Sequence, residues 1–321
     1  MPIPDHAVVI LDVGHGNSAV VHTSDKVIVI DAGPKRPLIE YLEEQSVRTI
    51  DTVLISHADE DHIGGLIGIV ACRKFEIGCV RLNTDSQKDT KSWDDLIKAL
   101  DSEGIPFLPA LAQGESFEYG PVQLSILGPS SFLAAKGPGG TDYKGRRVRT
   151  NSISAVIRVE FEENPVVLFP GDLDEIGLDE IRRKEVDIDA PVLVFPHHGG
   201  NPGTQDLVGF ARQICDKVSP TTVIFSQKRS GNPLPEIVKI LRAHNADIRV
   251  SCTQLSVNCS SEVPSIDPTH LLPIYSHGRI KGECCGGSFI IDLSTSTVTP
   301  ARELHREFIS GNVPNNLCIN P

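Results

Sequence analysis

Side chains that bind divalent metals crowd into residues 56–65, whose sequence is Ser-His-Ala-Asp-Glu-Asp-His-Ile-Gly-Gly. Four potential ligands fall within six positions: His57, Asp59, Asp61 and His62. Imidazole and carboxylate groups crowded in this way are costly at the edge of a buried core unless a cation compensates them. The stretch therefore predicts a metal site, and the alternative is an acidic helix cap with incidental histidines.

The elements around this stretch would hold it at the end of a strand. Residues 52–55 (Thr-Val-Leu-Ile) favour a buried strand, and the apolar, glycine-rich residues 63–72 favour a helix. Further strands are expected at 7–13, 19–23, 26–31, 79–82, 116–118, 122–127, 151–161, 165–169, 190–195, 222–225 and 247–250. Further helices are expected at 37–44, 93–103, 173–184, 205–218 and 235–243.

Five other motifs accompany the metal-binding stretch along the chain. They are LDVGHGNS at 11–18, VIDAG at 29–33, Asn-Ser at 151–152, FPGD at 169–172 and PHHGG at 196–200. Residues 57–62 resemble the HxHxDH signature of the metallo-β-lactamase fold, with Asp59 in place of the middle histidine. As an ordered set, the motifs resemble those of the metallo-β-lactamase domain of ComEC-type DNA-uptake proteins and their soluble stand-alone relatives, over roughly residues 6–250.

The resemblance implies an α/β fold, the αββα metallo-β-lactamase sandwich, in residues 1–250. The likeness fades from residue 251 onwards. Residues 251–321 are therefore expected to form a small cysteine-containing C-terminal extension packed on the first domain.

Carried over position by position, the resemblance implies a centre with two metals. One metal would be bound by His57 and Asp59, and the other by Asp61, His62 and His197, with Asp172 between them. Asp61, Asp172 and His198 would be the catalytic residues, and Asp31 would support the metal loop by hydrogen bonding. With Asp59 in place of histidine and Asn151 near the family's third histidine, the first site is oxygen-rich and suits Mn²⁺, whereas the second suits Zn²⁺. One tight and one exchangeable ion are expected.

Two of these assignments leave alternatives open. Asp172 would also suit the N-cap of the helix at 173–184, because aspartate is favoured there. Adjacent side chains point to opposite sides of an extended chain, so only one of His197 and His198 is expected to be a direct ligand. We favour His197, with His198 behind it or facing substrate.

Residues 128–150 change composition toward glycine, proline, serine and cations. Five cations and the single acid Asp142 lie between Lys136 and Arg149, a net charge of +4 in a protein of net charge −12. A flexible basic loop would suit closing on a phosphate-bearing substrate, and the alternative is a solvated surface loop. The predicted substrate contacts are His15, Asn151, Arg146, Arg147, Arg149 and Lys228. For His15, the alternative is a turn position in solvent.

The overall composition limits the function classes. The 321 residues hold 42 acidic and 30 basic side chains, which argues against coating nucleic acid through a basic surface. No apolar run reaches the roughly 20 residues that span a bilayer, and the N-terminus lacks a signal-peptide pattern. A soluble cytoplasmic protein without a membrane partner is expected, and the transport role of membrane-embedded ComEC proteins is not.

The cysteines favour thiols or metal ligands over disulfides, since there are eight of them in a chain expected to be cytoplasmic. Cys252, Cys259, His277 and Cys284 form a candidate structural zinc site, although their spacing matches no common zinc finger. Reduced structural thiols and a disulfide are the alternatives.

Together these features predict a metal-dependent hydrolase that activates water at one or two Zn²⁺ or Mn²⁺ ions, because no other nucleophile or phosphate-loop motif competes. The cationic loops and the motif set favour a phosphodiesterase or nuclease acting on nucleic acid or on a nucleotide. Aromatic residues make up 5% of the chain, which offers little for stacking successive bases and keeps small nucleotides open as substrates. The alternative is a non-catalytic or regulatory binding module in a larger assembly, with a partner protein that the sequence does not identify.

Overall fold

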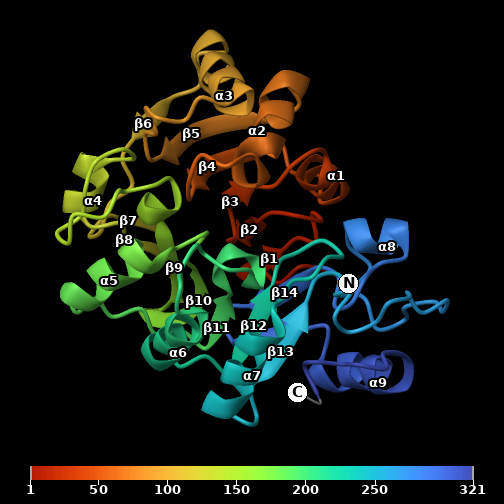
Figure 1. The fold of residues 1–321 in the computed structure, drawn as a ribbon. Coiled ribbons are helices and arrows are strands. Elements are labelled where there is room, and N and C mark those ends of the chain that lie inside the picture. The colour runs from red at the N-terminus through yellow and green to blue at the C-terminus, as the bar shows by residue number, and fades with distance from the viewer. Residues whose placement is uncertain (1, 320–321) are drawn as a thin grey trace.

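The computed structural model describes residues 2–319 as two stacked β-sheets with helices on both outer faces (Figure 1). Within this range, the eight strands of the first sheet lie in the order β15 (Thr297–Thr299), β14 (Phe289–Asp292), β1 (Ala7–Ile10), β2 (Ser18–His22), β3 (Val27–Ala32), β4 (Thr49–Ile55), β5 (Glu76–Leu82) and β6 (Phe107–Pro109). The seven described strands of the second sheet lie in the order β13 (Arg249–Cys252), β12 (Thr222–Phe225), β11 (Val192–Val194), β10 (Asn164–Phe169), β9 (Val156–Phe161), β8 (Val122–Gly128) and β7 (Ser116–Tyr119).

Helices lie outside the two sheets, and most of them cover an outer face. They are α1 (Pro37–Glu44), α2 (Glu60–Cys72), α3 (Lys91–Ser102), α4 (Ser131–Lys136), α5 (Glu175–Arg183), α6 (Leu207–Val218), α7 (Pro235–His244), α8 (His277–Lys281) and α9 (Arg302–Asn312), with 3₁₀ turns η1 (Asn151–Ile153) and η2 (Pro196–Gly199). The predicted αββα sandwich is confirmed. Within residues 2–319, none of the helices combines the length and the apolar character that crossing a bilayer requires.

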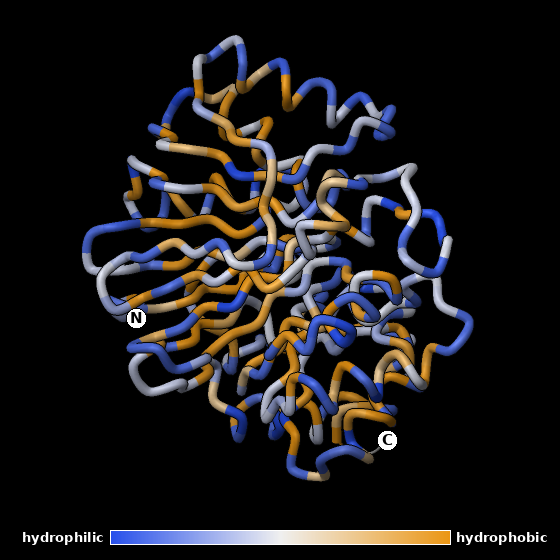
Figure 2. The backbone as a smooth tube through the Cα atoms, turned by 90° about the vertical axis from the view of Figure 1, so that its left-hand side faces the viewer, coloured by the Kyte–Doolittle hydropathy of each residue, from blue (hydrophilic) through white to orange (hydrophobic). Residues whose placement is uncertain are grey.

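The core is divided by the two sheets into an inner layer and two outer layers. Alternation along β1 shows the division: Val8 and Ile10 pack between the sheets, whereas Ala7 and Val9 face the helices. Helices α1, α2 and α3 cover the first sheet, and α5, α6, α7 and α9 cover the second. Figure 2 shows the strands largely orange and many of the connecting turns blue, as expected where apolar strands stack and polar turns meet solvent.

Parallel pairing brings the site loops to one edge. Strands β3, β4 and β5 are parallel in the first sheet, as are β10, β11, β12 and β13 in the second. The carboxyl ends of parallel strands share an edge, and ligands of open α/β sheets bind there. The segments that follow β3, β4, β10, β11 and β12 therefore meet at this edge.

The C-terminal segment contributes strands to the first sheet. β14 pairs antiparallel with β1, from Ala7 opposite Asp292 to Ile10 opposite Phe289, and β15 continues the sheet. Without β14, the buried strand β1 would have an unpaired edge. The expected division at residue 250 stays a prediction about folding units, but residues 251–319 do more than pack against the sandwich, because they supply two strands of the first sheet.

Agreement with the expected elements is closest where the apolar pattern is strong. Helix 37–44 and strand 222–225 are confirmed at both ends. The elements that were not expected are short or lie in polar or C-terminal segments: β6, α4, α8, β14, β15 and α9. Residues 151–155 precede β9 as a 3₁₀ turn and its exit, not as part of the strand.

Candidate metal centre

The metal-binding stretch lies between β4 and α2 and is held from behind by Asp31. Ser56 donates its backbone N–H and its hydroxyl to the Asp31 carboxylate, at 2.7 and 2.8 Å. Nδ1–H of His62, in the first turn of α2, donates to the same carboxylate at 2.7 Å. Asp31 has a φ of 56°, which is uncommon outside glycine and persists where surrounding contacts hold it. The hydrogen-bonding role expected for Asp31 is confirmed, and it turns Nε2 of His62 toward the site.

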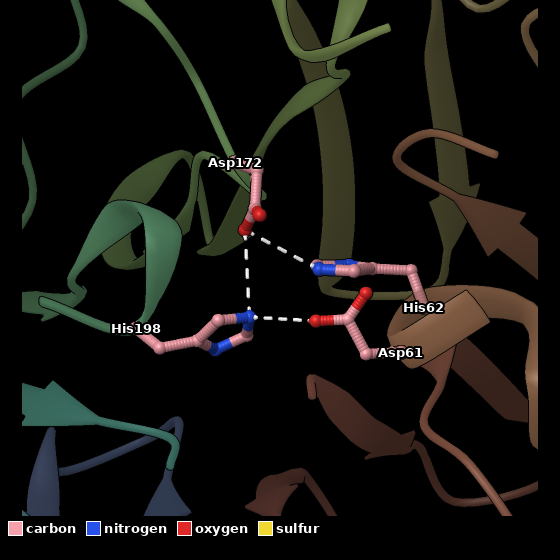
Figure 3. Close-up of side chains that lie close together, drawn as sticks. All are labelled: Asp61, His62, Asp172 and His198. Atoms are coloured by element: carbon pink, nitrogen blue, oxygen red, sulfur yellow. Dashed lines mark hydrogen bonds and ion pairs between the residues drawn. The ribbon is translucent and has the colours of Figure 1, made fainter. Parts of the chain in front are cut away.

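Four side chains converge in front of this support (Figure 3). Within residues 2–319, their ligand atoms all lie within 4.8 Å of one another: Asp61, His62, Asp172 and His198, called the quartet below. Nε2 of His62 lies 3.3 Å from Oδ1 of Asp172. Nε2 of His198 lies 3.7 Å from the same oxygen and 3.2 Å from Oδ2 of Asp61. Segments that are more than a hundred residues apart in sequence thus share one small volume.

Asp172 reaches the quartet from a tight turn after β10. Gly171 has a φ of 54°, and a Cβ on it would lie 2.3 Å from Oγ of Ser154, so the turn requires glycine. The carboxylate that caps α5 belongs to Asp174, which accepts from the backbone N–H groups of Ile176 and Gly177. The alternative that Asp172 is the helix cap is wrong, because α5 begins later than expected.

The adjacent histidines lie in a left-handed turn, not in an extended chain. The φ angles of His197 and His198 are 53° and 55°. Nδ1–H of His198 donates to the carbonyl of Ser226 at 2.7 Å, which turns Nε2 into the quartet. His197 lies outside the quartet and donates from Nδ1 to Oδ2 of Asp172 at 2.8 Å. The expectation that only one of the two is a direct ligand assumed an extended backbone, and that premise is wrong. The favoured residue was His197, but the imidazole that joins the quartet is that of His198.

His57 and Asp59 lie beside the quartet. Nε2 of His57 is 3.6 Å from Oδ2 of Asp59 and 3.9 Å from Oδ2 of Asp172. The other oxygen of Asp59 accepts a hydrogen bond from the ammonium group of Lys88, in the segment between β5 and α3. Burial disfavours the charged form of Asp59, but His57 and Lys88 outweigh it and lower the pKa of the carboxyl to about 2. Asp59, one of the two ligands predicted for the first metal site, is therefore already paired with the ammonium group of Lys88.

The quartet carboxyls are ionised at neutral pH. Burial raises the pKa of Asp61, but the hydrogen bond from His198 and the charges of His62 and His198 lower it overall. Burial likewise opposes ionisation of Asp172, and the same two histidines hold its pKa well below the usual range. Burial lowers the pKa of His62, but Asp31 and Asp172 raise it well above its ordinary value. The surroundings thus favour negative charge on the carboxyls and positive charge beside them.

The donor set fits a divalent cation. Among the described residues, Nε2 of His57, Nε2 of His62 and Oδ1 of Asp172 are buried without a hydrogen-bond partner, which is unusual for buried polar atoms. His62 and His198 each donate Nδ1–H away from the site, so in the neutral rings the Nε2 lone pairs face carboxylate oxygens. Such lone pairs repel one another unless a proton or a cation lies between them. Metal-binding histidines commonly show this pattern, with the other ring N–H donated to a carboxylate or carbonyl.

A pocket of about 450 Å³ opens in front of the quartet. It is lined by His15, Asp59, Asp61, Asp172, His197, His198, Gly200, Asn201 and Asn232. The loop of His15 approaches closely because Gly16 has a φ of 121° and a Cβ there would lie 2.1 Å from the carbonyl oxygen of Asp61. Nε2 of His15 lies 3.5 Å from Oδ2 of Asp61. His15 therefore belongs to the pocket and is not a turn residue facing only solvent.

Two of the predicted cationic contacts lie near this pocket. The side chain of Lys228 is exposed, and its charge contributes, after burial and the charge of His198, to lowering the pKa of His15. Arg149 is also exposed, and its guanidinium lies 3.4 Å from the position of a Cβ on Gly203, two residues after Asn201 of the pocket lining. Contact of either cation with a substrate stays a prediction.

The remaining predicted contacts lie elsewhere. Arg146 forms ion pairs with Asp142 and Asp179, each at 2.7 Å, which hold it against α5. In residues 2–319, no hydrogen bond or ion pair joins the side chain of Arg147 or Asn151 to the pocket lining. Asp142 also accepts backbone N–H groups of the same loop, so residues 142–146 form a defined turn. Arg146 is thus paired within its own loop and with α5, away from the pocket lining, and closure of the loop on substrate stays a prediction.

The predicted zinc tetrad does not converge. The part of the chain that the structure describes contains no second group of ligand atoms as close as those of the quartet. His277 packs against Gly14, and Cys284 lies near Asp12. Cys252 and Cys259 instead lie with other cysteines, Cys285 and Cys318. All eight cysteines fall within the described residues and are free thiols, which agrees with the alternative of reduced structural cysteines.

Two contributors were missed from sequence. The Ser56 hydroxyl lies 3.0 Å from Nδ1 of His57 and 3.2 Å from Nδ1 of His62, and its only sequence signal is its place next to His57. Lys88 lies 29 residues from Asp59 in a polar segment and carries no signal at all.

Comparisons with known proteins agree with this geometry. A family model described as the metallo-beta-lactamase superfamily matches residues 11–208. ComE operon protein 3 of Bacillus subtilis (strain 168) is 23% identical over 260 residues, which cover 73% of this chain and 30% of that protein. The anti-Pycsar protein Apyc1 of Paenibacillus sp. (strain J14) is 40% identical over 62 residues, 19% of this chain and 25% of that protein. The matched part of the chain thus spans less than a third of the length of either relative.

One solved structure is also similar to this chain. The metallo-beta-lactamase fold protein YhfI from Bacillus subtilis aligns with a TM-score of 0.45 and 11% identity, covering 77% of this chain and 96% of that one.

Proposed function

The chain belongs to the metallo-beta-lactamase superfamily, and on that premise we propose that it is a metal-dependent phosphodiesterase whose hydrolytic centre is the quartet. Membership in the superfamily, together with the quartet, supports a metal-dependent hydrolase. The finer proposal concerns the substrate, which we infer to be a phosphodiester of a nucleotide or a nucleic acid.

The observation that carries the proposal is the arrangement of buried donors. Nε2 of His62 and Nε2 of His198 face the ionised Asp61 and Asp172 within 3.2–3.7 Å. These four side chains would hold a Zn²⁺ or Mn²⁺ ion, with His57 and Asp59 available to a second, weaker one. A divalent ion in such a site supplies Lewis acidity and makes water a nucleophile near neutral pH.

The chain's own residues would prepare this centre in three ways. Asp31 and the Ser226 carbonyl fix the tautomers of His62 and His198, so both Nε2 atoms point inward. His197 donates to Asp172 and holds its carboxylate in place. His15, beside Asp61 and half-exposed, lies where it can exchange a proton with a leaving oxygen.

Charge at the pocket rim favours a phosphodiester over a lactam or a thioester. Lys228 and Arg149 are exposed cations on two different loops near the pocket. Guanidinium and ammonium groups bind phosphate oxygens through charge-assisted hydrogen bonds. The aromatic rings among the described lining residues are histidines, so stacking of successive bases is not provided, and this favours a small nucleotide.

Hydrolysis assays on the full chain test the proposal. Bis(p-nitrophenyl) phosphate, a cyclic dinucleotide, a fluorescent single-stranded DNA, a β-lactam and a glutathione thioester would each be incubated with Mn²⁺ or Zn²⁺. We expect cleavage of at least one phosphodiester and a loss of about a hundredfold or more in Asp61→Asn. Glu60→Gln, an exposed neighbour on α2, is the matched control and should retain activity. Turnover confined to the lactam or the thioester would contradict the substrate class.

One observation favours the alternative of a non-catalytic binding module. Lys88 supplies a cation to Asp59, where the family pattern expects part of a metal site. If metal and nucleotide bind to the quartet but no substrate turns over with either ion, the module is the better description. A cytoplasmic location and a partner protein remain predictions of the sequence.

A further inference from the structure

A second charged cavity lies at the end of the second sheet that is opposite to the metal centre. Four arginines are among its described lining residues: Arg242 of α7, Arg249 of β13, and Arg302 and Arg306 of α9. Arg249 is the first residue of its strand, whereas the metal centre lies beyond the last residues of the parallel strands β11 and β12. The arginine cavity, as we call it, is therefore separate from the quartet. Figure 1 shows α9 and β13 near the marked C-terminal end of the chain.

The guanidinium charges of this cavity are not cancelled by carboxylates. Arg249 is 6% exposed and donates to neutral acceptors, the carbonyls of Val298 at 3.1 Å and Pro300 at 2.7 Å. Arg242 donates to the carbonyl of Ile248 at 3.2 Å. In residues 2–319, the side chains of Arg302 and Arg306 take part in no hydrogen bond or ion pair. The charge of this cavity is therefore available to a ligand.

Two acids lie near the cavity, but neither forms an ion pair with its arginines. Asp247 is the acid among the described lining residues, and it forms no ion pair with the four arginines. Glu303 of α9 acts on Arg249 through its charge without a hydrogen bond to it. His305, which also lines the cavity, is neutral, because burial, Arg249 and His270 lower its pKa to about 3. Four cations therefore face one lining acid in a protein whose net charge is −12.

The shape and chemistry of the cavity suit a compact anion. Its volume is about 140 Å³, below the roughly 300–1,000 Å³ of pockets that enclose drug-sized ligands. Guanidinium groups match phosphate oxygens through paired N–H donors. α9 begins at Arg302, so the positive end of a helix of 11 residues lies at the same place. Arg249 is held rigidly by carbonyls, which prepares one of the four donors before the anion arrives.

We propose that the arginine cavity binds a phosphoryl group, carried either by inorganic phosphate or by a mononucleotide. The site does not depend on the metal centre or on the proposed hydrolysis. Arg302 and Arg306 are the contacts that an arriving anion would gain, and Arg249 and Arg242 line the wall behind them.

Titration calorimetry on the full chain tests this proposal. Inorganic phosphate and AMP would be titrated separately into the Asp172→Asn variant, in which a phosphate cannot use an intact quartet. We expect saturable binding of at least one of them at one site per chain. The double variant Arg302→Gln/Arg306→Gln in the same background should weaken it by about tenfold or more, since two charge-assisted contacts are lost. Binding of AMP alone identifies a nucleotide ligand, and binding of phosphate with or without AMP identifies the free anion as sufficient.

The control removes the same charge elsewhere. Arg48→Gln/Arg212→Gln replaces two exposed arginines that form no ion pair in the described chain and do not line the cavity. Binding should be unchanged in this variant. Equal losses in the two double variants, no saturable binding of phosphate or AMP, or binding of an acidic peptide in their place would each overturn the proposal. Circular dichroism and melting curves verify that the variants are folded. The single variants Arg302→Lys and Arg306→Lys are milder changes, because each keeps the positive charge.

Discussion

The quartet and the neighbouring His57–Asp59 pair are built from the same residue types but differ in how their charge is compensated. In the quartet, the ionised Asp61 and Asp172 face imidazole nitrogens, and among the described residues no lysine or arginine forms an ion pair with either carboxylate. In the pair, Asp59 is bound by the ammonium group of Lys88. The negative charge of the quartet carboxylates thus needs an external cation or protonated histidines to balance it. In the pair, Lys88 already balances part of the negative charge of Asp59.

This difference indicates how the two halves of a metal centre can be given unequal affinity. A lysine beside a ligand carboxylate must be displaced, or must share that oxygen, before a divalent ion gains its full interaction. The expectation of one tight and one exchangeable ion therefore acquires a structural reason. On the proposed function, the quartet would hold the tight ion, and the His57–Asp59 side would hold the exchangeable one.

The largest expected effect is on affinity for the tight metal ion, and it distinguishes the quartet from the His57–Asp59 pair. Asp172→Asn removes the carboxylate that contacts His57, His62, His197 and His198, so affinity for the tight ion should fall by about a hundredfold or more. Asp59→Asn should change that affinity by less than about threefold. Calorimetric titration with Zn²⁺ measures both. At about 100 times the dissociation constant, the ion should stabilise the natural chain by about 2.7 kcal/mol and leave the melting temperature of Asp172→Asn nearly unchanged. Comparable losses in the two variants would end the distinction between the halves.

Loss of the support behind the quartet should have a smaller effect. Asp31→Asn keeps a residue that tolerates positive φ but removes the charge that binds Nδ1–H of His62. Substitutions at such supporting positions typically weaken metal binding by about 10–100-fold. Metal content after dialysis, set beside that of the exposed variant Asp187→Asn, checks this. An Asp31→Asn protein that retains full metal would show that Ser56 alone positions His62.

Removing the ammonium group of Lys88 tests whether it limits metal binding on the His57–Asp59 side. Lys88→Met frees the Asp59 carboxylate, so the number of Mn²⁺ ions bound per chain should rise from about one toward two. Native mass spectrometry counts the ions. Lys91→Met, in the nearby first turn of α3 and without an ion pair in the described chain, is the matched control. An unchanged count would mean that Lys88 does not limit the second site.

The smallest expected effect on metal binding is at the pocket rim of the quartet. His15→Gln removes an imidazole 3.5 Å from Asp61 that has no place among the four ligands. Metal affinity should stay within about threefold, whereas kcat for the phosphodiester should fall by about 10²-fold or more, as for loss of a group that transfers a proton. A fall in metal affinity as large as that of Asp31→Asn would instead assign His15 to metal binding.

Local patterns in the chain were sufficient for the sandwich and for most of the candidate ligands. Strands such as 222–225 and the helix at 37–44 carry apolar runs or a proline start that are legible without tertiary contacts. Asp61 and His62 come together because they share the first turn of one helix. The short strand β14 was missed because its burial depends on pairing with β1, which lies almost 300 residues earlier. β15 was missed because it pairs with β14.

The sequence by itself determined which chemistry is available: carboxylates and imidazoles at the ends of buried strands, in a spacing that one divalent ion can use. Tertiary structure alone decided which of them converge. The left-handed turn at His197 and His198 selects the inward imidazole, Asp174 caps α5 and leaves Asp172 for the quartet, and Lys88 neutralises Asp59. These outcomes depend on backbone dihedral angles and on contacts between segments distant in sequence. The type of a side chain limits what it can bind, but the surrounding structure determines which groups it contacts.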